Sequence, residues 1–276
     1  MADLCTHLEW SLLNAAPSFS SFSGLAASLV LASMVIILVE YKGDENPTTA
    51  VAMFTVTLLA LGMDTFIFGA ASGEVQCARG DAQGLLGGST LATGVSILLL
   101  GITLLQAKFK HSHAGLTLLG NVVTSMGALG TMALLALWAT RLVDNLTILR
   151  LRPAPGISFV PSLLLIGIFL ATIIFVALAG PGRRIREVSI VVTTCIYLLH
   201  ILASFAMYVA TIVIPVAEWT VRTDSVVLVL TIAISIAFPF VELAGVVMSL
   251  DWRGGREFWH QPVVRLRRTR CPPGRA

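Results

Sequence analysis

Charged residues are scarce in this sequence. Only 12% of its 276 residues are Asp, Glu, Lys or Arg, whereas 56% are hydrophobic and the mean hydropathy is +0.89. A soluble globular chain carries about 25% charged residues. This low charge content, together with apolar runs of about 20 residues, excludes an ordinary soluble domain and predicts a polytopic helical membrane protein. The runs do not alternate with period two, which excludes a transmembrane β-barrel.

Motifs that mark common membrane enzymes and receptors are also missing. The sequence has four cysteines but no CxxC or His/Cys cluster, and it contains none of GxxxxGK[ST], HExxH or GxSxG. Its three lysines, Lys42, Lys108 and Lys110, fall at span ends or in loops, so the last span has no lysine to bind retinal. The arginine–aspartate and Asn-Pro-x-x-Tyr signatures of the large receptor family are absent, as are paired span histidines for haem. We therefore expect no catalytic residue, cofactor or metal, and nothing indicates an enzyme.

The apolar runs predict an all-α, seven-transmembrane-helix bundle. Each run is long enough to cross a hydrocarbon core of about 30 Å at 1.5 Å per residue. The predicted spans are 24–40, 50–71, 85–107, 114–140, 158–180, 187–214 and 225–250. Three regions follow: an extracytoplasmic N-terminal segment at 1–23, a seven-helix membrane domain at 24–250, and a basic cytoplasmic tail at 251–276. Within the first segment we expect a short interfacial helix that Pro17 ends.

The distribution of basic residues predicts the orientation. With the N-terminus outside, the cytoplasmic side carries 13 Lys and Arg residues and the outer side carries 5. Without the tail the counts are 6 and 5, so the tail decides that the C-terminus is cytoplasmic. The first 20 residues contain no Lys or Arg and do not resemble a secretory signal. The excess of Arg over Lys, 15 to 3, favours a bacterial source, and we expect the protein in the inner membrane.

Two cysteines, Cys5 and Cys77, fall on the predicted outer side. A disulfide can persist there, and one between these residues would tie the N-terminal segment to the loop after the second span. The alternative is two unrelated free thiols.

Three ionisable residues, Asp64, His200 and Glu242, lie well inside predicted spans. Such residues are rare in membranes and usually face the bundle interior. Their neighbours form polar stripes at helical spacing. The stripe of the sixth span is Thr193, Tyr197, His200, Ser204, Tyr208 and Thr211, and that of the seventh is Thr231, Ser235, Glu242 and Ser249. We expect the two stripes to meet in a polar seam.

The positions of the three residues along their spans predict three depths. Asp64 falls in the outer third, His200 near the midplane and Glu242 in the inner third. Burial disfavours the charged form of each group, so each could exchange a proton near neutral pH. In the alternative interpretation, Asp64 and Glu242 are protonated, or pair with His200 or Asn121, and only lock the bundle. In the third span, Gly87, Gly94 and Gly101 recur every seven residues and indicate close helix packing.

Two function classes remain. The first is a small proton-linked transporter or channel whose candidate residues are Asp64, His200, Glu242, Tyr197, Ser204, Tyr208, Thr231 and Ser235. The second is a non-transporting sensor or assembly protein that acts through its outer loops or its arginine-rich tail. The expected partners are the bilayer, anionic lipid head groups beside the tail and a second copy of the chain. Nothing indicates nucleic acid.

Overall fold

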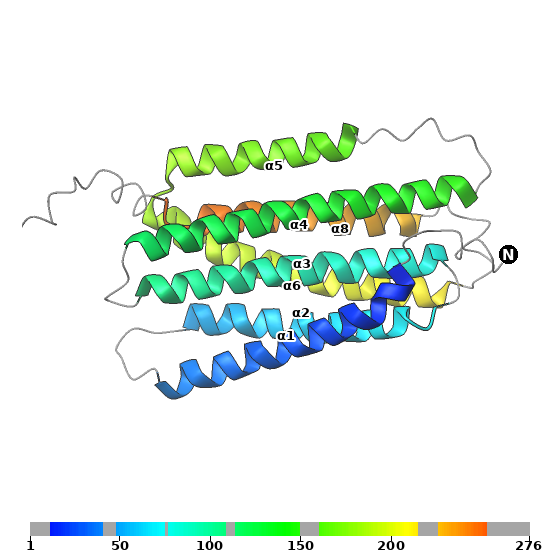
Figure 1. Cartoon of the computed structure of the whole chain (residues 1–276), viewed down its shortest axis with the longest axis horizontal. Coiled ribbons are helices and arrows are strands. Elements are labelled where there is room, and N and C mark those ends of the chain that lie inside the picture. The colour runs from blue at the N-terminus through cyan, green and yellow to red at the C-terminus, as the bar shows by residue number, and fades with distance from the viewer. Residues whose placement is uncertain are drawn as a thin grey trace, which may run out of the picture.

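The computed structural model describes residues 12–40, 48–74, 77–108, 114–149, 160–214 and 226–252. In these ranges the chain forms helices and no strands, which confirms the all-α class. The helices, labelled as in Figure 1, are α1 (Leu12–Glu40), α2 (Thr48–Ala71), α3 (Cys77–Lys108), α4 (Ala114–Leu149), α5 (Val160–Ala179), α6 (Arg183–Val213) and α8 (Val226–Ser249).

Six of these helices are long and apolar enough to cross a membrane. Their apolar stretches are Ala15–Val35, Thr49–Ala71, Arg79–Leu105, Thr117–Thr140, Arg183–Val213 and Val229–Ser249, while α5 contributes a shorter one, Leu163–Ala179. Large apolar side chains such as Phe175 and Leu178 are 71% exposed on the outer faces of the bundle. Exposed apolar surface together with helices of this length is typical of proteins embedded in a membrane. The chain is therefore a helical membrane protein, while the count of seven spans and the orientation remain predictions.

Helix α3 is the centre of the bundle. The helices run side by side along one direction, and α3 packs against α1, α2, α4, α6 and α8, whereas α5 lies at one edge against α4 and α8 (Figure 1). The composition of α3 suits this place because its glycines let neighbouring side chains approach the backbone. A Cβ atom at Gly87 or Gly101 would lie 3.2 Å from the ring of Phe68 or Phe54, respectively. The close packing predicted from the glycine repeat is thus confirmed.

The turn between α5 and α6 follows from its sequence, Gly180–Pro181–Gly182. The backbone N–H of Gly180 closes α5 by donating to the carbonyl of Val176 at 2.9 Å, and Gly180 has a φ of 58°, which glycine adopts without strain. Pro181 cannot continue the helix, and α6 begins at Arg183. This short connection returns the chain antiparallel to α5 (Figure 1).

Pro17 does not end a helix, contrary to the prediction. It lies inside α1, which is continuous from Leu12 to Glu40. Pro17 lies in the second turn of α1, where its missing N–H removes one backbone hydrogen bond, to the carbonyl of Leu13, and the helix continues past it. The division of the chain at residue 23 remains a prediction.

Several predictions lie outside the described residues. Cys5 and the side chain of Cys77 are not among the described residues, so the disulfide between them remains a prediction. The same holds for most of the outer loops and for the tail, on which the orientation and the sensor or assembly hypothesis depend.

Candidate functional site

The two polar stripes are buried in the bundle. All six stripe residues of α6, from Thr193 to Thr211, have relative exposures of 3% or less, and the four of α8 have exposures of 1% or less. Helix α6 packs against both α8 and α3, so its polar face lies between two neighbours. Thr231, Ser235, Tyr208 and Ser204 therefore lie inside the bundle and not at the lipid surface.

His200 is the meeting point of three helices. Its Nε2 atom lies 3.2 Å from the hydroxyl of Ser89 on α3, and its Nδ1 atom lies 3.1 Å from Oε2 of Glu242 on α8. Its ring stacks on Phe238 with centroids 5.3 Å apart and an interplanar angle of 13°. Both His200 and Glu242 are fully buried. The imidazole is thus held on both nitrogen atoms and on one face, which fixes its orientation.

Asp64 joins the same cluster through α3. The hydroxyl of Thr90 donates to Oδ1 of Asp64 and also contacts the carbonyl oxygens of Gly87 at 3.0 Å and Leu86 at 3.2 Å. The hydroxyl of Tyr197 on α6 donates to the backbone carbonyl of Thr90 at 3.0 Å. Since Thr90 follows Ser89 in the chain, Asp64 and His200 are bonded to consecutive residues of α3.

These contacts correct the predicted depths. The sequence positions placed Asp64, His200 and Glu242 in three separate layers. The hydrogen bonds instead gather them at one level, with Glu242 in direct contact with His200 and Asp64 one residue of α3 away. We call Asp64, Ser89, Thr90, Tyr197, His200 and Glu242 the polar cluster.

The proposed pairing of Asn121 with a buried acid is wrong. The side-chain amide of Asn121 donates to the backbone carbonyl of Asp251 at 2.9 Å, beyond the end of α8. The partner of Asp64 is Thr90 instead.

Sequence reasoning missed Ser89 and Thr90, the two residues that connect the cluster. A signal for them exists, because Ser89, Thr93 and Ser96 follow steps of four and three along α3 and are all buried. The sequence analysis instead interpreted the glycines of the same helix, Gly87, Gly94 and Gly101, as a sign of close packing. Both roles hold, since Gly94 lies beside the Tyr197 hydroxyl, which would be 2.5 Å from a Cβ at that position.

Four buried oxygen atoms of this region have no hydrogen-bond partner among the described residues. They are Oδ2 of Asp64, Oε1 of Glu242 and the hydroxyls of Ser204 and Ser235. A buried polar atom without a partner is costly, and native proteins satisfy nearly all of them with protein groups or ordered water. The cluster therefore has free acceptor capacity at both carboxyl groups.

In the described part of the chain, no group of three or more His, Cys, Asp or Glu side chains could hold a metal ion. Comparison of the sequence with protein-family models and curated proteins, and of the fold with solved structures, gives no match. The fold and the polar cluster define a helical membrane protein with three ionisable groups joined inside its core, and the geometry of that cluster carries the functional argument.

Proposed function

We propose that this chain is a small proton-linked transporter or channel in which the polar cluster binds and releases protons. The observation that carries the proposal is the position of His200 between Ser89 and Glu242, at 3.2 and 3.1 Å. Ionisable groups inside membrane bundles commonly belong to proton relays, and a histidine held between two partners is suited to such a step.

Counting donors and acceptors around His200 indicates one proton shared between His200 and Glu242. The Ser89 hydroxyl has a single hydrogen, which it donates to the carbonyl of Leu86 at 2.8 Å. It therefore accepts from His200, whose Nε2 carries a hydrogen. One further proton must lie between Nδ1 of His200 and Oε2 of Glu242. It resides either on the acid, which leaves both groups neutral, or on the imidazole, which leaves an ion pair.

Both states keep every hydrogen bond of the pair. They differ only by a proton shift along one contact of 3.1 Å, so the exchange requires no movement of a helix. In hydrocarbon the neutral state avoids burying two charges, whereas water or a cation beside Oε1 of Glu242 would favour the ionised state. The position of the proton in the His200–Glu242 pair would thus depend on whether water or a cation lies beside Oε1 of Glu242.

Asp64 supplies a second proton site. Its Oδ1 atom contacts Thr90, and its Oδ2 atom has no partner among the described residues. When Asp64 is ionised, Thr90 donates to it. When Asp64 is protonated, it can donate to Thr90, whose hydrogen then turns to the carbonyl of Gly87 at 3.0 Å. Asp64 contacts Thr90, and the His200–Glu242 pair contacts the preceding residue, Ser89. The two sites can therefore bind and release protons one after the other.

The test is infrared difference spectroscopy of the purified protein in lipid vesicles, titrated from acidic to alkaline pH. We expect carbonyl bands of protonated carboxylic acids that change with pH, one of which is lost in Asp64→Asn and another in Glu242→Gln. Proton uptake under an applied membrane potential, followed with an entrapped pH-sensitive dye, should fall in both variants. Thr172→Val is the control, because Thr172 lies on α5, away from the polar cluster, and its hydroxyl donates within its own helix, to the carbonyl of Ile168. If the carboxyl bands do not change with pH, the polar cluster does not exchange protons and has only a structural role.

A further inference from the structure

The polar row beside the cluster continues toward one end of the bundle. Helices α6 and α8 are antiparallel, and His200 lies against Phe238 and Glu242. One turn further along α6, at about 5.4 Å, Ser204 is therefore level with Ser235. The next turn places Tyr208 level with Thr231.

This row ends close to charged residues. After Tyr208, the hydroxyl of Thr211 accepts from the amide of Gln83 at 3.3 Å. Gln83 lies near the start of α3, one turn after Arg79, which forms an ion pair with Glu74 at 2.5 Å. Polar groups thus extend at each turn from His200 to the end of the bundle where α2 meets α3.

The opposite direction is closed between α6 and α8. Arg186 and Asp251 form an ion pair at 2.7 Å, and Gly245 brings the two backbones close together. The hydroxyls of Ser189 and Ser249 both donate to the carbonyl of Gly245, at 3.1 and 2.7 Å. Each of these polar groups has a protein partner.

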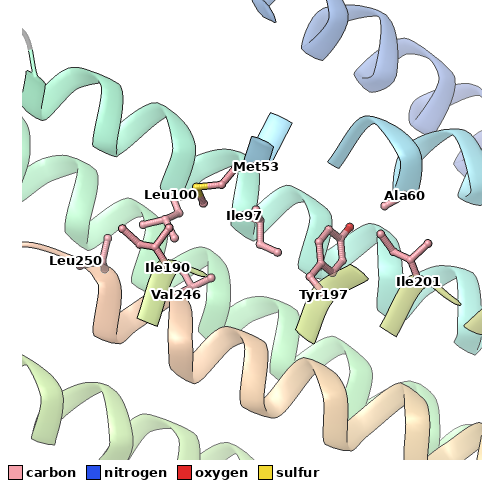
Figure 2. Close-up of a cluster of buried hydrophobic side chains, with 9 residues drawn as sticks. All are labelled: Met53, Ala60, Ile97, Leu100, Ile190, Tyr197, Ile201, Val246 and Leu250. Carbon is pink, nitrogen blue, oxygen red and sulfur yellow. The ribbon is translucent and has the colours of Figure 1, made fainter. Parts of the chain in front are cut away.

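Apolar side chains seal the same side. Figure 2 shows them projecting from α2, α3, α6 and α8, and we call Met53, Ile97, Leu100, Ile190, Val246 and Leu250 the apolar plug. All six are 9% exposed or less. The apolar plug packs together with Ile201 and with Tyr197, which belongs to the polar cluster (Figure 2). Protons crossing this region would find no continuous hydrogen-bonded path.

Among the described residues beside the closed side, α2 and α4 carry three unpartnered oxygen atoms, on Thr57, Asn121 and Ser125. On α6 and α8 themselves, within the described residues, such atoms lie only from Glu242 toward the end where α2 meets α3. They are Oε1 of Glu242 and the hydroxyls of Ser204 and Ser235. Buried water is the usual partner of such atoms, because each molecule can bridge two to four polar groups.

We propose that a file of water molecules, held by Glu242, Ser204 and Ser235, connects the polar cluster to the end of the bundle where α2 meets α3, and that the apolar plug closes the other end. This inference rests on the proposed proton exchange, since the file is the route by which protons arrive. Pro239 supports it, because this residue has no N–H to donate to the carbonyl of Ser235, which leaves one more acceptor beside the file.

Cysteine accessibility tests the route. In a background with the native cysteines replaced by alanine, Ser204→Cys and Ser235→Cys are treated with a small, charged methanethiosulfonate. Matched controls are Thr193→Cys and Ser249→Cys, which lie on the same two stripes on the closed side. Because the reagent attacks a thiolate, and thiolates form in water and not in apolar surroundings, the two test positions should react an order of magnitude faster than the controls. Reagent applied to one side of vesicles identifies the open end.

Equal or faster reaction of the controls would overturn the proposal, and so would the absence of reaction at Ser204→Cys and Ser235→Cys. Radiolytic hydroxyl labelling of the unaltered protein avoids any effect of the substitutions on folding. Oxidation of Tyr208 with Met53 spared supports the water file, whereas oxidation of Met53 with Tyr208 spared contradicts it. Neither readout depends on carboxyl titration, so the route and the proton exchange fail separately.

Discussion

Gly245 of α8 packs directly against Thr193 of α6 on the closed side. A Cβ atom added there would lie 2.1 Å from the hydroxyl oxygen of Thr193 and 3.3 Å from its Cβ atom. The first distance is far below any van der Waals contact. Thr193 is buried at 3% exposure, so Gly245→Ala must push the two helices apart or force Thr193 into another rotamer.

The expected cost follows from these distances. Overpacking a well-packed interior costs about 1–3 kcal/mol. Alanine recovers up to about 1 kcal/mol over glycine in a helix. The net destabilisation should be about 1–2 kcal/mol, which changes the ratio of folded to unfolded protein by a factor of about 5–30. Thr193→Ala removes the hydroxyl oxygen and leaves only the contact at 3.3 Å, so the double variant should regain most of this loss.

The assay is unfolding of the purified protein in mixed micelles with increasing sodium dodecyl sulfate, followed by circular dichroism. Gly167→Ala is the matched control, because no atom of another residue lies within 4 Å of a Cβ atom at that helical glycine. Gly245→Ala should unfold at a lower detergent fraction than wild type, whereas Gly167→Ala should not. If the two single variants are equally stable, or if Thr193→Ala adds to the loss, the close approach of α6 and α8 is refuted.

Three other outcomes are expected. Glu242→Leu should be less stable than Glu242→Gln by about 1–3 kcal/mol in the same assay, because leucine leaves Nδ1 of His200 without a partner and glutamine can still donate to it; equal stabilities would contradict the pairing. Gly94→Ala should destabilise the protein because its Cβ atom would lie 2.5 Å from the Tyr197 hydroxyl, and Tyr197→Phe in the same chain should restore stability; a failure to restore it would place the clash elsewhere. A reporter enzyme fused after Ala276 should be active only in the cytoplasm, since arginines anchor the tail there, and outer activity would reverse the orientation.

Local sequence was sufficient for the helices and for their buried faces. Hydropathy predicted each described helix, because a chain in hydrocarbon must satisfy its backbone hydrogen bonds internally and a helix does so within one segment. Period-3.6 spacing predicted which face of α6 is polar, and the structure buries that face from Thr193 to Thr211. The spacing of polar residues along a helix decides which of them share a face, and this does not depend on the neighbouring helices.

Only the tertiary structure decided which polar groups meet. The sequence offered Asn121 or His200 as partners for Asp64, and the bundle selects Thr90 because α3 packs against α2. Depth along a span did not predict these contacts, since Nδ1 of His200 and Oε2 of Glu242 lie 3.1 Å apart. Contacts between residues far apart in the chain depend on the order and tilt of the helices around α3. No single span encodes that arrangement, and it emerges only when all the small and large side chains pack together.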